Sequence, residues 1–238
     1  MGWLLLNGFL RFNYPDATEF PVQGIDISHH QGTIDWRKIA GDRPGFVIMK
    51  ATQGRGYRDP RFRPNWEAAG AAGIVRGAYH FFEFCTSGAV QARNFMGAVH
   101  PGQRMLPPAI DVEFEGNCER WPGPEKVRQE LGGMIRLLER AYGRKPILYA
   151  NYRAYDRIIA GHFEGCPIWI RDIFFRPRLS DGRPWLFWQY ANNGRAAGIS
   201  TRVDLDVFNG PPADLAGLCL SIQPKPRGDA LESSVGIE

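Results

Sequence analysis

Leu106-Pro-Pro-Ala-Ile-Asp-Val-Glu-Phe-Glu115 begins as an apolar strand and ends in carboxylates, and the predicted fold is built around it. Side chains alternate along a strand, so Asp111 and Glu113 are expected on the same face, with Cα atoms roughly 6.5 Å apart. Two carboxyl groups this close, rooted in an apolar strand, push each other's pKa values apart. One protonated acid beside one ionised acid is what cleavage of a glycosidic bond requires.

This acidic pair has two other interpretations, a solvated strand end and a pair of carboxylates holding a metal ion. An isolated Asp-x-Glu cannot decide between the three, because acidic pairs are common. The positions of the other polar residues in the fold are needed to choose among them.

The chain on both sides of this strand alternates strands and helices from Val22 onward. Residues 46–49 are all apolar, which is typical of a strand buried on both faces. Asp59 is expected to cap one helix and Ser87 the next, while Gly143 ends the longest helix. Five strands are predicted at residues 22–28, 45–51, 74–82, 106–115 and 146–150, and helices at 35–39, 60–73, 87–100 and 124–142.

In the last third of the chain, the predicted strands follow one another without long helices between them. A short helix is predicted at 152–160, then strands at 167–171, 185–190 and 203–208 with too few residues between them for full helices. The pattern predicts an α/β fold, a modified TIM-like barrel with five β/α units followed by three strands with little helix.

One catalytic barrel domain is expected over 22–220. Residues 1–21 are either an N-terminal arm or the remnant of an export or anchor segment, and 221–238 read as a disordered tail.

Composition narrows the classes of function. A chain of 238 residues with 44% hydrophobic residues suits one barrel with a substantial core. The net charge of +4 carries no Lys/Arg cluster, so no nucleic-acid partner is expected. The apolar run near the N-terminus is too short to span a bilayer. A monomer is expected.

The cysteines are Cys85, Cys118, Cys166 and Cys219. They form no Cys-x-x-Cys pair and have no His at metal-ligand spacing, so no metal site is predicted. Disulfides are possible, but scattered buried thiols are the favoured interpretation.

Polar and aromatic residues fall at or near the predicted strand ends, where barrels of this class build their active sites. The acids are Asp26, Asp111, Glu113 and Asp204, with Asp206 two residues further on. The others are Lys50, Tyr79, Tyr149, Trp169, Arg171, Gln189 and Tyr190. Each could be structural by itself, but together they predict an acidic floor with aromatic walls at one end of the barrel.

Eight short motifs then occur in a recognisable order: Gly24-Ile-Asp-Ile-Ser-His-His-Gln-Gly32, Lys50-Ala-Thr-Gln-Gly54, Arg76-Gly-Ala-Tyr-His-Phe81, Ile110-Asp-Val-Glu113, Ile147-Leu-Tyr149, Pro167-Ile-Trp169, Trp188-Gln-Tyr190 and Val203-Asp-Leu-Asp-Val-Phe208. As an ordered set, over residues 22–208, they resemble the glycoside hydrolase family 25 muramidases, the Chalaropsis-type lysozymes. That family has a barrel of the predicted kind.

The resemblance implies cleavage of the β-1,4 bond between N-acetylmuramic acid and N-acetylglucosamine in peptidoglycan. No cofactor or metal is expected, because the predicted cleft lacks paired His or Cys and its acids are needed for the reaction. The resemblance also implies Glu113 as general acid, Asp111 as its stabilising partner, and Asp26 and Asp204 as further acids of the cleft. It places four substrate-binding residues around them, namely Tyr79, Tyr149, Trp169 and Gln189, and Lys50 is predicted as a fifth from its position at a strand end. The expected location is secreted, periplasmic or associated with the cell envelope.

Two residues depart from the family pattern. Gln53 stands where the family often has Glu, and Asp206 where it often has Asn. Neither touches the Asp-x-Glu pair, so activity is still expected.

Two alternatives stay open: a catalytically weak cell-wall-binding module that uses the same cleft, and a hydrolase of a related N-acetylated polymer such as chitin.

Overall fold

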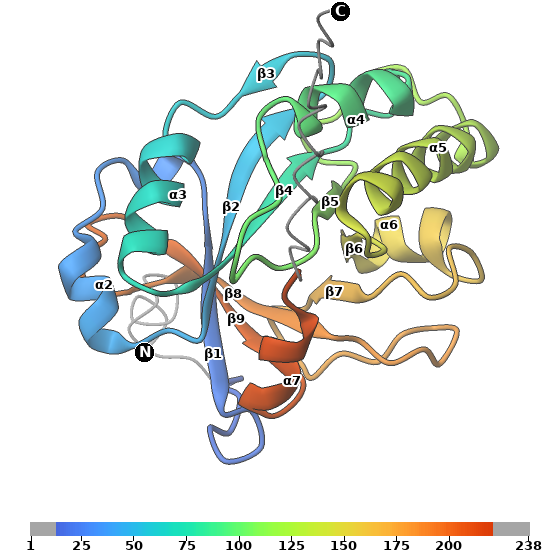
Figure 1. Cartoon of the computed structure of the whole chain (residues 1–238). Helices are drawn as coiled ribbons and strands as arrows, with labels where there is room; N and C mark the ends of the chain where they lie inside the picture. The colour runs from blue at the N-terminus through green and yellow to red at the C-terminus, as the bar shows by residue number, and fades with distance from the viewer. Residues whose placement is uncertain (1–12, 221–238) are drawn as a thin grey trace, which may run out of the picture.

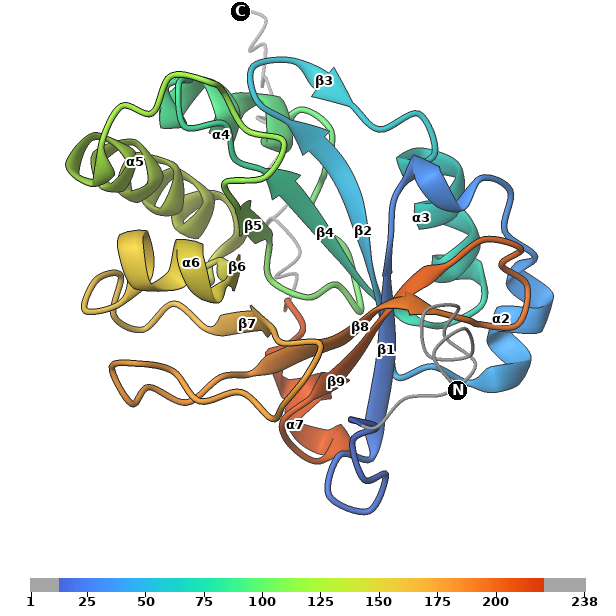
Figure 2. The ribbon, with the colours of Figure 1, turned by 180° about the vertical axis from the view of Figure 1, so that it is seen from behind.

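The computed structural model describes residues 13–220, and within them eight strands close into a barrel (Figures 1 and 2). The strands are β1 (Val22–Ile27), β2 (Phe46–Gln53), β4 (Val75–Phe81), β5 (Ala109–Val112), β6 (Ile147–Asn151), β7 (Ile168–Arg171), β8 (Phe187–Gly194) and β9 (Val203–Phe208). Their order is β1-β9-β8-β7-β6-β5-β4-β2, and pairing of β1 with β2 completes the ring. All neighbours are parallel except β9, which runs antiparallel to both β8 and β1.

Helices follow the first five barrel strands, and loops connect the last three. The helical segments are η1 (His29–Gln31), α2 (Trp36–Asp42), α3 (Phe62–Ala71), α4 (Gly88–Met96), α5 (Pro124–Tyr142), α6 (Tyr152–Ala154) continuing into the π-helical turn η2 (Tyr155–Ile159), and α7 (Pro212–Leu218). In Figure 1, α2 and α3 lie on one side of the barrel and α4 to α6 on the other. The predicted barrel of five β/α units and three further strands is confirmed.

One predicted helix cap is wrong, and a second has the predicted residue without the capping bond. The helix predicted from residue 60 begins at Phe62, and the Asp59 carboxylate accepts hydrogen bonds from the backbone N–H groups of Arg61 and His29, both at 2.9 Å. Asp59 therefore ties two loops together. Ser87 precedes α4 without a side-chain capping bond. The carboxylate of Glu130 on α5 accepts from the Gly88 N–H instead, at 2.9 Å, because the two helices pack closely there.

Strand β3 (Tyr57–Arg58) was not predicted; it is a two-residue strand that pairs antiparallel with the end of β2. Both of its side chains are exposed, so no hydrophobic alternation marks it. It extends β2 into a short hairpin at the rim of the barrel.

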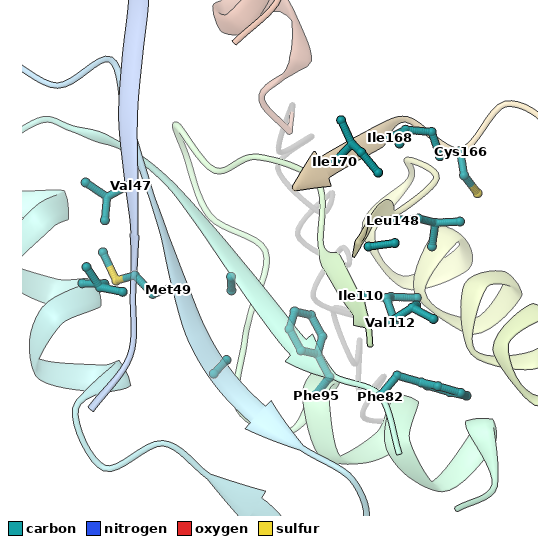
Figure 3. Packing of buried hydrophobic residues seen from close by; sticks show 14 of the residues in the cluster. Val47, Met49, Phe82, Phe95, Ile110, Val112, Leu148, Cys166, Ile168 and Ile170 are labelled. Atoms are coloured by element: carbon teal, nitrogen blue, oxygen red, sulfur yellow. The ribbon is translucent and has the colours of Figure 1, made fainter. Parts of the chain in front are cut away.

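Alternation along the strands divides the core into two layers. Outward side chains pack beneath the helices, and Figure 3 shows this layer with Ile110 and Val112 of β5 beside Leu148 and Ile170 from β6 and β7. Inward side chains fill the barrel, among them Phe46, Ile48, Ile147, Phe187 and Phe208. Gly24 faces inward on β1, and a Cβ there would collide with the Phe46 ring, so only glycine leaves room for that ring.

The antiparallel direction of β9 determines what lies at each end of the barrel. Its last residue, Phe208, pairs with Val22 at the start of β1, while Asp204 near its start pairs with Asp26 near the end of β1. Asp204 therefore reaches the same rim as the C-terminal ends of the parallel strands. Helix α7 follows β9, and its Leu215 packs into the inner layer at the opposite end.

The described part of the N-terminal arm packs on the barrel. The Asn13 side chain donates to the carbonyl oxygens of Ile173 and Tyr190, at 2.8 and 2.9 Å. Phe20 is buried against the rings of Trp185 and Trp188. Residues 1–12 and the tail 221–238 lie outside the described residues, so an export or anchor remnant and a disordered tail stay predictions. Within residues 13–220, no helix is long and apolar enough to cross a membrane.

Candidate active site

Eight of the nine predicted site residues line one pocket of about 90 Å³ at the rim. All eight come from inward positions of the strands, or in the case of Glu113 from the residue that follows β5. The lining residues are Asp26, Tyr79, Asp111, Glu113, Tyr149, Trp169, Gln189 and Asp204. Four carboxyl groups separated by up to 178 residues of sequence thus converge, because each occupies the same level of the barrel.

Lys50 is the predicted residue that does not line this pocket. The pairing of β2 with β4 shifts between Lys50 and Thr52, so Lys50 and Gln53 both lie on the inner side of the bulge. The Lys50 Nζ donates to Gln53 Oε1 at 2.8 Å and lies 5.1 Å from the Phe81 ring centroid. Its charge still lowers the pKa of Asp111 against the effect of burial.

Asp111 and Glu113 differ in their surroundings. Asp111 is buried, and its Oδ1 has no hydrogen-bond partner among the described residues. Glu113 is partly exposed; its Oε1 accepts from Asn151 Nδ2 at 3.2 Å and lies 3.6 Å from Arg171 Nη1. Burial raises the pKa of both carboxyls, and the negative charge of Glu113 raises that of Asp111 further. The pair therefore retains a proton at a pH where isolated carboxyls are ionised.

Three further acids form a hydrogen-bonded row across β1 and β9. Asp26 lies between Asp204 and Asp206 and makes a hydrogen bond with each. Asp26 Oδ2 also accepts from Gln189 Nε2 at 2.6 Å. Burial, with the charge of a neighbouring aspartate, raises the pKa of Asp26 well above its usual range and raises those of Asp204 and Asp206 to about 8. The three aspartates of this row therefore share protons near neutral pH instead of carrying three negative charges.

The wall of the pocket is aromatic. Trp169 packs edge-on against Tyr149, with ring centroids 4.6 Å apart, and against Tyr79 at 6.5 Å. Tyr149 donates its hydroxyl to Gln189 Oε1 at 2.9 Å, which orients the amide that holds Asp26. Trp188 and Tyr190 lie on the other face of β8 and belong to the outer core. The alternating Trp/Gln pattern therefore assigns Trp169 and Gln189 to the pocket and Trp188 to the core.

The acids of the pocket are poorly suited to hold a metal ion. In the described part of the chain, no three His, Cys, Asp or Glu side chains are placed to hold one ion together. Protonated carboxyl groups also make poor ligands, since metal binding requires the ionised form.

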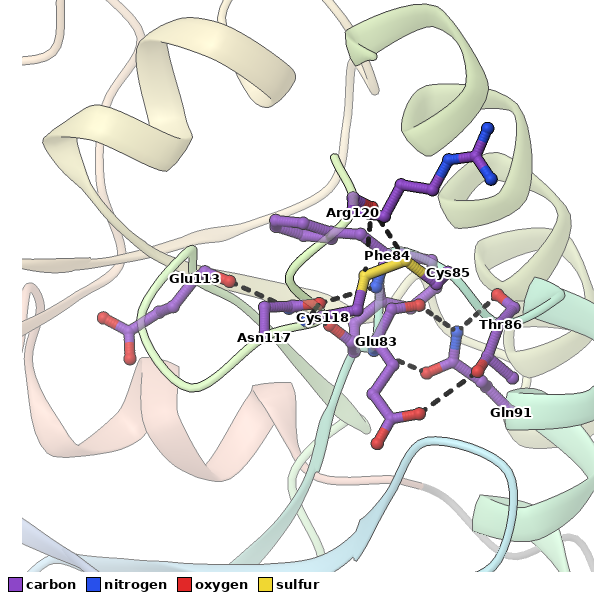
Figure 4. The surroundings of a disulfide bond; sticks show 10 residues. Glu83, Phe84, Cys85, Thr86, Gln91, Glu113, Asn117, Cys118 and Arg120 are labelled. Atoms are coloured by element: carbon purple, nitrogen blue, oxygen red, sulfur yellow. Dashed lines mark hydrogen bonds between the residues drawn. A yellow bond between two sulfur atoms is a disulfide. The ribbon is translucent and has the colours of Figure 1, made fainter. Parts of the chain in front are cut away.

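The expectation of scattered buried thiols is wrong for two of the four cysteines. Cys85, in the loop after β4, and Cys118, in the loop after β5, form a disulfide with Cα atoms 6.2 Å apart (Figure 4). Sequence could not reveal this pair, because the two loops meet only when β4 and β5 pair. Cys166 is a free buried thiol and Cys219 a free half-buried one.

Asn117, next to the disulfide, fixes the backbone beside Glu113 (Figure 4). Its Nδ2 donates to the carbonyl oxygens of Glu113 and Phe82, at 2.9 and 2.8 Å, and its Oδ1 accepts from the N–H of Phe84 at 2.8 Å. The loop that carries Glu113 is thereby attached to the end of β4. Asn117 and Asn151 were not among the predicted site residues, and of the two only Asn151 occupies a strand end, the one position that pointed to the site.

Asn117→Ala is expected to lower the free energy of unfolding by about 1–3 kcal/mol, because partly buried backbone groups lose their partners. The matched variant Asn117→Asp keeps the acceptor for Phe84 and removes both donations. Urea unfolding followed by fluorescence measures the loss. The aspartate variant is expected to lose less stability than the alanine variant. Repulsion between the new carboxylate and Glu113 would add to its loss, and unfolding at high and low salt measures that repulsion separately. Unchanged stability in both variants would contradict the role assigned to Asn117.

Comparison with known proteins identifies relatives over most of the chain. The sequence profile of glycosyl hydrolases family 25 matches residues 25–199. The chain is 35% identical to the uncharacterized protein YegX of Escherichia coli O6:H1 over 212 residues, covering 87% of this chain and 76% of that one. It is 34% identical to lysozyme M1 of Streptomyces globisporus over 209 residues, covering 83% and 71% respectively. A family 25 glycosyl hydrolase from Bacillus anthracis has a similar structure, with a TM-score of 0.82, 39% identity, and coverage of 87% of this chain and 98% of that one.

Proposed function

Because the chain belongs to glycosyl hydrolases family 25, we propose that it is a peptidoglycan hydrolase, a lysozyme that cleaves the β-1,4 bond between N-acetylmuramic acid and N-acetylglucosamine. The observation that carries this proposal is the meeting of Asp111 and Glu113 with Asp26 and Asp204 in one pocket with aromatic walls. Tyr and Trp rings offer the flat apolar faces on which sugar rings pack.

Glu113 is the proposed general acid. It is the more exposed member of the pair, so a leaving-group oxygen can reach it. Burial raises its pKa, which favours the protonated form that a general acid needs. Asn151 and Arg171 contact its Oε1, which supports the carboxylate once the proton has left.

Asp111 is the proposed stabilising partner. A pocket of about 90 Å³ is far below the roughly 300–1,000 Å³ of a site that encloses a whole ligand, so only part of a sugar enters it. The unpartnered Asp111 Oδ1 offers an acceptor to the N–H of an N-acetyl group. We propose that the substrate's acetamide enters this pocket, where Asp111 orients it and Tyr79, Tyr149, Trp169 and Gln189 surround it.

Digestion of purified peptidoglycan, followed by borohydride reduction and mass spectrometry of the products, tests the bond cleaved. A muramidase leaves N-acetylmuramic acid at the new reducing end, so reduced muramic acid is expected in the products. Reduced glucosamine ends would replace the proposed specificity, and cleavage of chitin at a comparable rate would favour the chitin alternative. Binding to peptidoglycan without any product would favour the wall-binding alternative, which has no support in the arrangement of acids.

The substrate lies in the cell envelope, so the proposed site of action is secreted, periplasmic or envelope-associated. The Cys85–Cys118 disulfide agrees with this location, since disulfides persist in oxidising compartments. A monomer stays the expected working form.

Chelators are expected to leave the rate unchanged, because sugar groups and protons occupy the carboxyls during the reaction. The measurement is turbidity of a peptidoglycan suspension with and without EDTA after dialysis. Loss of activity in EDTA and its return with a divalent ion would make the metal-binding interpretation of the acidic pair the better one.

A further inference from the structure

Asp206 belongs to the acidic row but does not line the pocket. It is fully buried, faces Gln189 across the β8–β9 pairing, and lies diagonally opposite Asp26 across the β1–β9 pairing. Its Oδ1 accepts the indole N–H of Trp169 at 2.8 Å. Its Oδ2 is buried, and no N–H or fixed hydroxyl group within residues 13–220 donates to it.

The remaining neighbour of Asp206 is the Asp26 carboxyl, with which it makes a hydrogen bond. Two carboxylates cannot hydrogen-bond to each other unless one of them carries a proton. Trp169 already donates to Asp206, and that bond stabilises Asp206 as the ionised member. The proton between them therefore belongs to Asp26.

We propose that Asp206 is a positioning residue that accepts a hydrogen bond from protonated Asp26 and so keeps the Asp26 carboxyl neutral where it faces the pocket. This inference rests on the proposed function of that pocket. A neutral Asp26 leaves Glu113 and Asp111 as the groups whose charge changes during the reaction.

The surroundings of Asp26 agree with this assignment. The acids and tyrosines that face it from the neighbouring strands oppose a negative charge on Asp26, while the cations Lys50 on β2 and Arg171 on β7 act on Asp111, Glu113 and Asp204. Gln189 Nε2 is the neutral donor that holds its other oxygen. The facing groups are Asp204 and Asp206 on β9, Asp111 and Glu113 at the end of β5, Tyr79 on β4 and Tyr149 on β6.

Asp206→Asn replaces the acceptor that faces Asp26 with a hydrogen-bond donor. The amide oxygen stays on the Trp169 N–H, so the amide NH₂ turns toward Asp26 and donates to it. A donor in place of an acceptor, together with the loss of the Asp206 charge, favours ionised Asp26. The pKa of Asp26 is therefore expected to fall by roughly 1–3 pH units, the usual effect of such changes on a carboxyl group.

Carbon-13 NMR of aspartate-labelled protein without substrate measures this titration, with the Asp26 signal assigned through Asp26→Asn. We expect a protonated Asp26 at pH 7 in the native protein and a titration at lower pH in Asp206→Asn. The control Asp214→Asn removes an exposed carboxyl on α7 by the same change and is expected to leave the Asp26 signal unmoved. An ionised Asp26 at pH 7 in the native protein, or an unshifted titration in Asp206→Asn, overturns the inference.

Peptidoglycan digestion at a series of pH values distinguishes this inference from the proposed function. With Asp26 ionised, its charge raises the pKa of nearby Glu113, so the alkaline limb of the Asp206→Asn profile is expected to move to higher pH. An alkaline limb that stays in place overturns the link between Asp26 and Glu113. If the native protein releases no product but the Asp26 titration shifts as expected, the proposed function fails and the hydrogen-bond assignment stands.

Discussion

Glu113→Gln is expected to lower the rate of peptidoglycan cleavage by at least ~10²–10⁴-fold, the usual contribution of a general acid. Glutamine retains the shape of the side chain and its contact with Asn151, but it cannot deliver a proton to the leaving oxygen. Because the pKa of Glu113 is raised, activity of the native enzyme should fall as the pH rises through that value and the proton is lost. Initial rates of product release from peptidoglycan, measured over pH, check both statements.

Glu115→Gln is the matched control for this substitution. Glu115 also accepts a hydrogen bond from Asn151, at 2.9 Å, but it is exposed and does not line the pocket. Its charge raises the pKa of Glu113, so its removal should move the alkaline limb slightly to lower pH and leave the maximal rate close to native. Near-native cleavage by correctly folded Glu113→Gln would remove Glu113 from the role of general acid.

The barrel was predictable from sequence because its strands and long helices carry strong local signals. Helix α5 occupies residues 124–142 as predicted, with Pro124 at its start and Gly143 after its end. The residues that cap the helices were less predictable, because contacts between segments far apart in sequence determine them. Asp59 bonds to His29 from a distant loop, and the backbone of Gly88 is held by Glu130 of another helix.

The pocket was predictable for a related reason. Alternation along each strand assigns residues to the inner face, and barrel closure brings those faces together, so eight of the nine predicted side chains converge. Lys50 lies beside this pocket rather than in its lining, because a bulge in β2 lets it bond to Gln53, and its predicted contact with substrate stays a prediction. The Cys85–Cys118 disulfide and the Asn117 bonds join adjacent loops that are far apart in sequence, and no local pattern encodes such pairs.

Peptidoglycan with a free amine in place of the muramic acid N-acetyl group is expected to resist cleavage. Two routes to a retained product differ here: a carboxylate attacks the sugar to form an ester, or the substrate's own acetamide oxygen attacks. Asp111 and Glu113 lie at the same end of β5 and line the same pocket, an arrangement suited to orienting an acetamide beside the acid rather than to attack from the opposite face. The buried, unpartnered Asp111 Oδ1 supports the same choice.

Loss of the acetamide should cost at least ~10³-fold in rate, since well-placed intramolecular nucleophiles act at effective molarities of roughly 10⁵–10⁸ M. Chemical re-acetylation of the same glycan should restore cleavage, and binding measured with inactive Glu113→Gln separates lost affinity from lost chemistry. Asp111→Asn should slow the enzyme less than Glu113→Gln, because an amide oxygen still accepts one hydrogen bond from the acetamide N–H. A sugar ester trapped on Asp111 or Asp26 and detected by mass spectrometry, or undiminished cleavage of the de-N-acetylated glycan, would establish the carboxylate route instead.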